Sequence, residues 1–325
     1  MACGLCGEVG RVCGPAAAKR AERCIVSLHS DAALDADATR AVVLPGARPR
    51  RARGSSSRAI SSLKWVVLVV AIALAITPIL YLIATSFKSP DDILSTRILP
   101  ARFAVENWAS AMANWPIFTY LGNSLLVAGV AVVVALLIAV PANYAIARLR
   151  VGGGQTLLLI VSAYIAPPVV AIVPLFLLVR TAGLMNSPFG LGLVEGLMLT
   201  PVAVWLLDGF FRGIPAEIDE AAQLDGCGPV RTLVSVLLPL ITPGLVAVGI
   251  IVFILVYNDF LIPLLLTQTG SAQTLPVGIA LMQGGREVMF GQMAAASLTG
   301  IIPVYLLALF AQRWLIGGLT QGSVK

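Results

Sequence analysis

The chain has 325 residues, of which 58% are hydrophobic and only 12% are charged. Its mean hydropathy of +0.93 lies far outside the range of soluble proteins, so a soluble globular fold is excluded and several membrane spans are expected. The formal net charge of +6 would suit a nucleic acid partner, but the placement of the basic residues, given below, favours a membrane topology signal instead.

Residues 1–62 differ from the rest of the chain. They are rich in Ala, Arg and Gly, and they lack the apolar core and small-residue cleavage site of a secretory signal. The cysteines and the histidine of this segment match no compact zinc finger in their spacing: Cys3, Cys6, Cys13, Cys24 and His29. We therefore expect a disordered cytoplasmic extension, or upstream sequence wrongly included in the reading frame, with a zinc site as the less favoured alternative.

Residues 63–325 contain six long apolar segments, which we interpret as one domain of six transmembrane helices. A hydropathy window of about 19 residues selects segments of the length that crosses a bilayer. The segments are Trp65–Phe87, Asn123–Ala147, Thr156–Val179, Leu191–Phe211, Val236–Leu266 and Ala295–Ile316. Prolines at positions 167, 168 and 174 interrupt the third segment, and the fifth is long enough to include a helical lead-in. The expected fold class is an all-α integral membrane protein.

The basic residues predict which ends of these helices face the cytoplasm. If the amino terminus is cytoplasmic, the basic stretch 48–64, the loops around residues 148–150 and 212–231, and the carboxyl-terminal tail all fall on the cytoplasmic side. The opposite side has fewer basic residues, namely Lys88, Arg97, Arg102, Arg180 and Arg286. This asymmetry follows the positive-inside rule. We therefore expect a multi-pass protein of the cell membrane with both termini in the cytoplasm.

A charged hairpin separates the fourth and fifth apolar segments, in the stretch "IPAEIDEAAQLDGCGPVRTLVSVLLPLITPGL". Pro215 suits a helix start, and the acids that follow lie near the positive end of the helix dipole. Gly226, Gly228 and Pro229 are expected to end this helix, with a positive φ at Gly226. The hairpin is thus a short cytoplasmic helix tied to spans on both sides. It either transmits force from a soluble partner or rests on the lipid surface as an ordinary amphipathic loop.

The stretch "EAAQLDGCGPVRTLVSVLLP" resembles the EAA loop of permease subunits of ABC importers. The pattern is E-A-A, three residues, G, nine residues, an aliphatic residue, one residue and L-P. It is matched by Glu220, Ala221, Ala222, Gly226, Val236, Leu238 and Pro239. Other stretches, among them "APPVVAIVPLFLLVRTAGLMNS" and "QRWLIGGLTQGSVK", resemble the carbohydrate-importer branch and its six-span, maltose-permease-G-like subunit. The resemblance extends from about Trp65 to Lys325.

This resemblance implies a mechanism and a set of partners. The residues expected to couple the chain to a cytoplasmic ATPase are Glu220, Ala221, Ala222, Asp225, Gly226, Leu238 and Pro239. Two ATPase copies, a second permease chain and an extracytoplasmic solute-binding protein complete the family's assembly, and the ATPases drive alternating access for a sugar or related polyol. ATP and Mg belong to the ATPase, because this chain has no G-x-x-x-x-G-K-[ST] phosphate loop. The chain is therefore expected not to be an enzyme, to need no cofactor, and to contact lipid but no nucleic acid.

Polar residues within the apolar segments are candidates for a translocation path. The sharpest are Tyr257, Asn258 and Asp259, because an ionisable residue within a span is costly and is usually functional. We expect Asp259 in the outer half of the fifth span and the Tyr257 ring flat against a sugar. Alternatively, Asn258 and Asp259 pin this span to a neighbour. Glu195 is expected at the outer edge of the fourth span, where it reaches water.

Two other function classes compete with an ATP-driven importer. A secondary, ion-coupled multi-pass transporter predicts broken half-helices and acids near the membrane midplane, and Asp259 is the main residue that would fit. A membrane enzyme needs a catalytic set, but the single histidine, His29, lies in the extension and no H-E-x-x-H zinc motif occurs. The E-A-A match is unexplained by either alternative.

Overall fold

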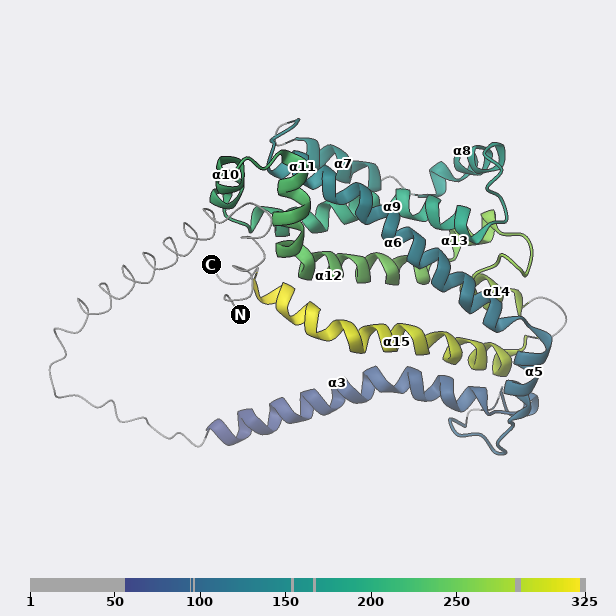
Figure 1. Cartoon of the computed structure of the whole chain (residues 1–325). Coiled ribbons are helices and arrows are strands. Elements are labelled where there is room, and N and C mark those ends of the chain that lie inside the picture. Colours follow the sequence, from purple (N-terminus) through teal and green to yellow (C-terminus); the bar gives the residue numbers. More distant parts are fainter. Residues whose placement is uncertain are drawn as a thin grey trace, which may run out of the picture. The chain divides into compact units, whose positions relative to one another are not determined.

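The computed structural model describes residues 56–93, 95, 97–152, 155–165, 168–283 and 288–321. All regular elements of these residues are helices (Figure 1), which confirms the expected all-α class. The described chain divides into two units. One unit comprises residues 56–75 with Pro215–Leu240, and the other comprises residues 76–214 with residues 241–321.

The helices keep the labels of Figure 1. They are α3 (Ser56–Ser86), α4 (Pro90–Ile93), α5 (Glu106–Asn114), α6 (Ile117–Ala147), α7 (Thr156–Ile165), α8 (Pro168–Thr181), α9 (Pro188–Arg212), α10 (Ala216–Leu224), α11 (Pro229–Arg231), the π-helix η1 (Thr232–Leu237), α12 (Leu238–Tyr257), α13 (Leu261–Leu266), α14 (Leu275–Leu281) and α15 (Phe290–Gln321).

Five stretches of helix in the described residues are long and apolar enough to cross a membrane. They are Lys64–Ser86, Ile117–Ala147, Pro188–Arg212, Pro229–Tyr257 and Phe290–Gln312. These match the first, second, fourth, fifth and sixth expected segments. The third segment is instead divided between α7, of 10 residues, and α8, of 14 residues. Each is shorter than the roughly 20 residues that a single crossing needs, and adjacent prolines disfavour a continuous helix at this point.

The fifth expected span is also interrupted, at the residues proposed for the translocation path. Helix α12 ends at Tyr257, and α13 begins only at Leu261. Asp259 Oδ1 accepts hydrogen bonds from the N–H groups of Phe260 at 2.8 Å and Leu261 at 3.2 Å. These side-chain contacts compete with the helical ladder, and Pro263 has no N–H to donate to the carbonyl of Asp259. The expected continuous helix Val236–Leu266 is therefore corrected to two helices with a break.

Close packing of α6 against α9 forms the centre of the larger unit. A Cβ built on Gly192 would lie 2.7 Å from the Cβ of Val130, and one on Gly196 would lie 2.7 Å from that of Val134. Side chains at these glycines would therefore prevent the approach of the two backbones. On α6 a series of fully buried alanines follows three-and-four spacing: Ala128, Ala131, Ala135 and Ala139. Small residues at such spacing are typical of helix contacts in membranes.

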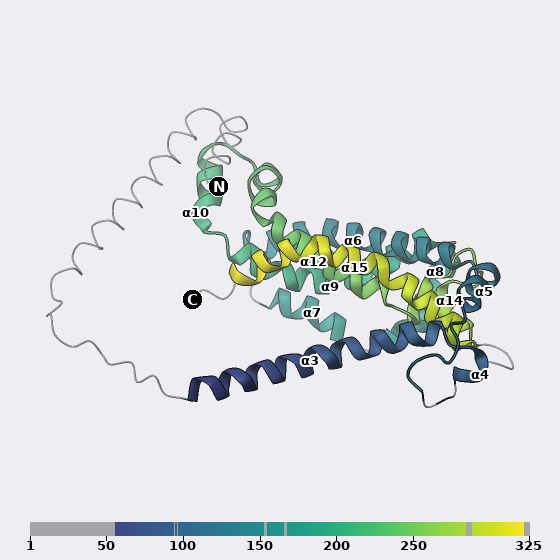
Figure 2. The ribbon, with the colours of Figure 1, turned by 90° about the horizontal axis from the view of Figure 1, so that it is seen from below.

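Loops and short helices close one end of the larger unit. Figures 1 and 2 both show α5 and α14 at the same end of α6 and α15, and α14 contacts both of these long helices. Asn123 donates to the carbonyls of Ser271 and Gln273, each at 2.9 Å. Asn186 Oδ1 accepts from the N–H groups of Gln268 and Thr269. These bonds fix the segment between α13 and α14 and so set where α13 ends.

Candidate functional site

The hairpin with the E-A-A sequence is a short helix ended by a glycine turn (α10 and α11 in Figure 1). Pro215 precedes the first residue of α10, and Asp225 follows its last. Gly226 has a φ of +78°, which confirms the expected left-handed conformation. Its N–H donates to the backbone carbonyl of Gln223 at 2.9 Å, and the N–H of Cys227 donates to the backbone carbonyl of Ala222 at 2.9 Å. This pair of bonds is a Schellman motif, which satisfies carbonyls that the helix end would leave unpaired.

The hairpin exposes a mixture of acidic and apolar side chains. Glu220 and Ala221 are exposed, whereas Ala222 is buried. Leu224 and Val230 are 82% and 74% exposed. The exposed surface of the hairpin thus combines two apolar side chains with the acidic residues of α10.

The second arm of the hairpin leads directly into a membrane span. From Pro229 to Tyr257 the chain is helical, and Thr232–Leu237 is π-helical. Leu238 is half-buried and Pro239 is exposed at the start of α12. Pro239 cannot donate to the preceding turn, and π-helical turns are found where a helix ladder is disturbed. Leu238 and Pro239, which close the E-A-A pattern, therefore lie where the hairpin becomes the span.

Arg148 ties the end of α6 to the residue that precedes the hairpin. Its Nη2 donates to the carbonyl oxygen of Ile214 at 2.7 Å. Ile214 follows α9 and is joined by one peptide bond to Pro215, where the hairpin begins. A displacement of Ile214 would therefore act on both α9 and α6.

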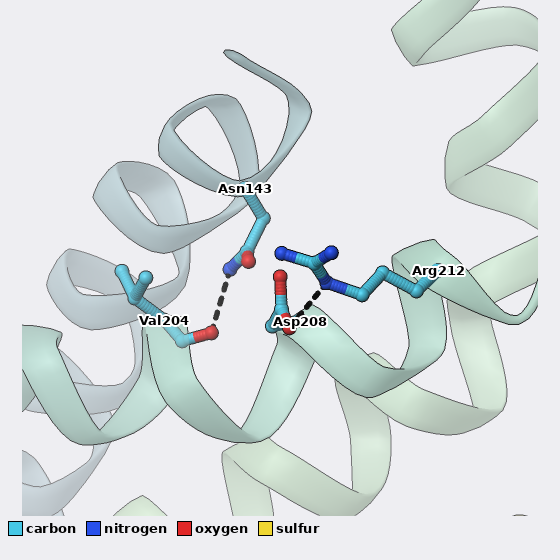
Figure 3. A network of polar contacts seen from close by, with 4 residues as sticks. All are labelled: Asn143, Val204, Asp208 and Arg212. Carbon is cyan, nitrogen blue, oxygen red and sulfur yellow. Dashed lines mark hydrogen bonds and ion pairs between the residues drawn. The ribbon is translucent and has the colours of Figure 1, made fainter. Parts of the chain in front are cut away.

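A polar cluster lies between the same two helices. Asn143 of α6 is fully buried and donates to the carbonyl of Val204 in α9 at 3.0 Å. Asp208 lies one turn after Val204 in α9, and its Oδ2 accepts a hydrogen bond from Arg212 Nε at 2.7 Å. Figure 3 shows the Asn143 amide, the Asp208 carboxylate and the Arg212 guanidinium gathered between α6 and α9. The bond from Asn143 to Val204 joins the two helices, whereas Asp208 and Arg212 pair within α9.

The three residues proposed for the translocation path lie at the end of α12 but differ in their surroundings. Tyr257 is buried, its hydroxyl donates to the carbonyl of Gly300 at 2.8 Å, and its ring stacks on Phe253. The hydroxyl thus contacts α15 and the ring contacts a residue of its own helix, and contact of this ring with a sugar stays a prediction. Asn258 is exposed and Asp259 is half-buried, both in the break before α13.

Glu195 is a candidate that the sequence interpretation missed. It was expected at the edge of the fourth span in contact with water, but it is only 4% exposed. Helix α9 begins at Pro188, so Glu195 lies about two turns inside it. Among the described residues, its Oε1 has no hydrogen-bond partner. An acid within the apolar run "GLGLVEGLML" was the signal that could have identified it.

An open cavity of about 360 Å³ lies between α6, α12 and α15. Its lining is apolar and includes Gly129, Leu136, Gly249, Phe253 and Leu307. Hydroxyl groups placed there would lose their hydrogen bonds with water and gain none. This cavity is therefore a poor site for a sugar, and the break between α12 and α13 is the better candidate.

Comparison with known proteins identifies a family. The family described as "Binding-protein-dependent transport system inner membrane component" matches residues 145–316. The trehalose/maltose transport system permease protein MalG of Thermococcus litoralis is 31% identical over 271 residues, which are 81% of this chain and 98% of the relative. The trehalose transport system permease protein SugB of Mycobacterium tuberculosis is 33% identical over 267 residues, 80% of this chain and 97% of the relative.

Further similarities extend the range of named substrates. The sulfoquinovosyl glycerol transport system permease protein SmoH of Agrobacterium fabrum is 34% identical over 251 residues, 76% of this chain and 88% of the relative. Among solved structures, a chain of a bacterial ABC transporter involved in the import of the acidic polysaccharide alginate has a TM-score of 0.66 and 22% identity. That match covers 80% of this chain and 98% of the other, and it supports the fold.

Proposed function

Because the chain belongs to the family of inner membrane components of binding-protein-dependent transport systems, we propose that it is the permease subunit of an ATP-driven importer for a sugar or related polyol. The observation that carries this proposal is the similarity of about four fifths of the chain to sugar-transport permeases. The E-A-A hairpin, which lies within the matched residues, also supports it. The substrate moves by alternating access of the membrane helices.

The permease crosses the membrane six times, with α7 and α8 together forming the third crossing. Their combined length is sufficient, although each alone is too short. Discontinuous helices at membrane depth are tolerated where protein covers the break or a polar path adjoins it. With six crossings both termini lie in the cytoplasm, as the distribution of basic residues favours.

The hairpin is the coupling element and docks on a cytoplasmic ATPase. Leu224 and Val230 supply apolar contact area, and Glu220 supplies charge near the start of α10. Movement of the hairpin reaches the spans by two covalent connections, through α9 and through α12. The hydrogen bond from Arg148 to Ile214 adds α6 to the moving group.

The assembly contains one further permease chain, two copies of the ATPase and an extracytoplasmic solute-binding protein. ATP and Mg bind to the ATPases, and this chain binds neither. Asn258 and Asp259 contact the solute on its path, while Tyr257 holds the end of α12 against α15. A partner permease chain would cover the exposed side of this break.

Purification of the chain from its native membrane tests this function. We expect an ATPase and a second permease to co-purify, and we expect the solute-binding protein with its sugar to stimulate ATP hydrolysis. A panel of neutral sugars then identifies the substrate. Purification of the chain alone, together with uptake that follows an ion gradient, would favour the ion-coupled transporter instead.

A further inference from the structure

The segment of residues 97–105, between α4 and α5, presents large apolar side chains at the surface. We call this segment the 97–105 loop. Its exposed apolar side chains are between 63% and 75% exposed, namely Ile98, Leu99, Phe103 and Val105. Apolar side chains that gather in one exposed segment usually mark a contact with a membrane or with another protein.

The 97–105 loop is held at the end of the first membrane span. The apolar run that ends at Ser86 has 23 residues, enough to cross a bilayer. The N–H of Ala104 donates to the carbonyl of Phe87 at 2.8 Å, and the ring centroids of Phe103 and Phe87 lie 6.1 Å apart, edge to face. Figure 2 shows α4 and the segment after it beside this end of α3. Phe103 therefore lies at the depth where acyl chains meet headgroups.

Two buried charged side chains fix the backbone of the loop. Asp92 Oδ2 accepts a hydrogen bond from the N–H of Ala101 at 2.8 Å. Lys88, which is only 1% exposed, donates to the carbonyl of Arg97. Both bonds go to the loop backbone, so they hold its shape while its apolar side chains stay exposed. The exposure of these side chains is thus built into the fold of the segment.

Two arginines lie among the exposed apolar side chains. Arg97 and Arg102 are exposed, and residues 97–105 contain no acidic residue. A guanidinium group binds phosphate through paired hydrogen bonds, and a long arginine side chain can reach the headgroups from the edge of the apolar layer. Anionic phospholipid offers acyl carbons and phosphate at the same depth. A soluble partner would have to enter the headgroup layer to cover the same side chains.

We propose that the 97–105 loop lies in the lipid interface and binds anionic phospholipid. Leu99 and Phe103 contact the upper acyl carbons, and Arg97 and Arg102 bind the phosphate groups. In the proposed topology this is the leaflet on the side opposite the ATPase. The contact does not depend on the solute that the permease carries. It anchors the end of α3, because the loop is bonded to the residue that follows this helix.

Photocrosslinking in nanodiscs tests which molecule covers the loop. Phe103 is replaced by p-benzoylphenylalanine, and the purified permease with its partners is placed in equal amounts of phosphatidylglycerol and phosphatidylcholine. Mass spectrometry should identify lipid adducts, with phosphatidylglycerol in excess. Absence of lipid adducts, or adducts to a protein subunit in their place, would overturn the proposal.

Phe118 provides the matched control position for this crosslinking. It is 69% exposed in the first turn of α6, and residues 103–147 contain no basic residue. The same photoreactive residue placed there should give lipid adducts in proportion to the lipid composition. An equal excess of phosphatidylglycerol at both positions would show that the loop has no headgroup preference of its own.

Removing the two arginines tests the recognition of phosphate. Arg97→Gln combined with Arg102→Gln keeps the bond from Lys88, because that bond goes to the carbonyl of residue 97. The excess of phosphatidylglycerol at position 103 should fall about fivefold for each arginine removed, while lipid adducts persist. Arg180→Gln, which removes an exposed arginine in the last turn of α8, should leave the excess unchanged. An excess that survives the loss of both loop arginines contradicts the phosphate contact.

Fluorescence quenching tests the depth of the loop. Phe103→Trp keeps an aromatic ring beside Phe87 and adds a reporter, which is measured as the increase over wild-type fluorescence. Brominated phospholipid should quench this added fluorescence, and iodide in the aqueous phase should leave it almost unchanged. The reverse result would place the loop in water and overturn the proposal.

Discussion

Replacing Gly226 by alanine tests whether the turn after α10 controls binding of the ATPase. Gly226 has a φ of +78°, and a Cβ built there would meet no heavy atom within 4 Å. The cost of the change is therefore backbone strain alone, about 1–2 kcal/mol for an L residue in the left-handed region. If this strain falls entirely on the docking conformation, the population of that conformation drops by about five- to thirtyfold.

Gly228 provides the matched control, because it lies two residues away and needs no special conformation. Its φ is −71°, and a Cβ there also meets no heavy atom within 4 Å. We expect the apparent Kd for the ATPase to rise about five- to thirtyfold in Gly226→Ala and to be unchanged in Gly228→Ala. The assay is titration of the purified ATPase against the permease in nanodiscs. Identical affinities for the wild type and both variants would refute the role assigned to this turn.

Three further predictions concern other parts of the chain. A chain shortened to begin at Ser55 should assemble and transport normally, and loss of uptake at normal membrane levels would contradict this. Gly196→Ala should destabilise the permease by about 1–3 kcal/mol through overpacking between α6 and α9. Gly122→Ala is the control and should not, because a Cβ built at Gly122 meets no heavy atom within 4 Å. Thermal unfolding in detergent measures both. Two hydrogen bonds lower the pKa of Asp92 below its usual 3.8. The larger effect comes from the N–H of Ala101 and the smaller from the hydroxyl of Ser95. A carboxyl group whose pKa is lower in the folded than in the unfolded chain stabilises the fold at any pH above its unfolded pKa. The contribution of Asp92 to stability should therefore be constant at neutral pH and be lost only below about pH 4. Asp92→Asn should lack this loss.

Hydropathy alone predicted most of the membrane helices, because length and composition determine whether a segment can cross a bilayer. It did not predict their interruptions. The fifth span ends at Tyr257 because the side chain of Asp259 bonds to the backbone of the next two residues. Such local competition depends on one side chain and leaves the average hydropathy of the segment unchanged.

The hairpin was more predictable than the candidate path. The positive φ at Gly226 could be predicted because many helices end on a left-handed residue, usually glycine. This preference depends only on the local sequence. The burial of Glu195 is not local. It depends on how α9 packs against other helices, such as its close approach to α6 at Gly192 and Gly196, and this packing cannot be inferred from periodicity.

The central claim is that ATP hydrolysis in a partner, transmitted through the hairpin, drives solute uptake by this chain. Its most direct test is uptake of labelled sugar into proteoliposomes that contain the purified assembly, with the solute-binding protein outside and ATP inside. We predict uptake only with internal ATP, no effect of collapsing proton and sodium gradients, and a strong reduction by Glu220→Lys, which reverses a charge on the exposed face of α10. Uptake that persists without ATP and disappears with the ion gradient would contradict the claim.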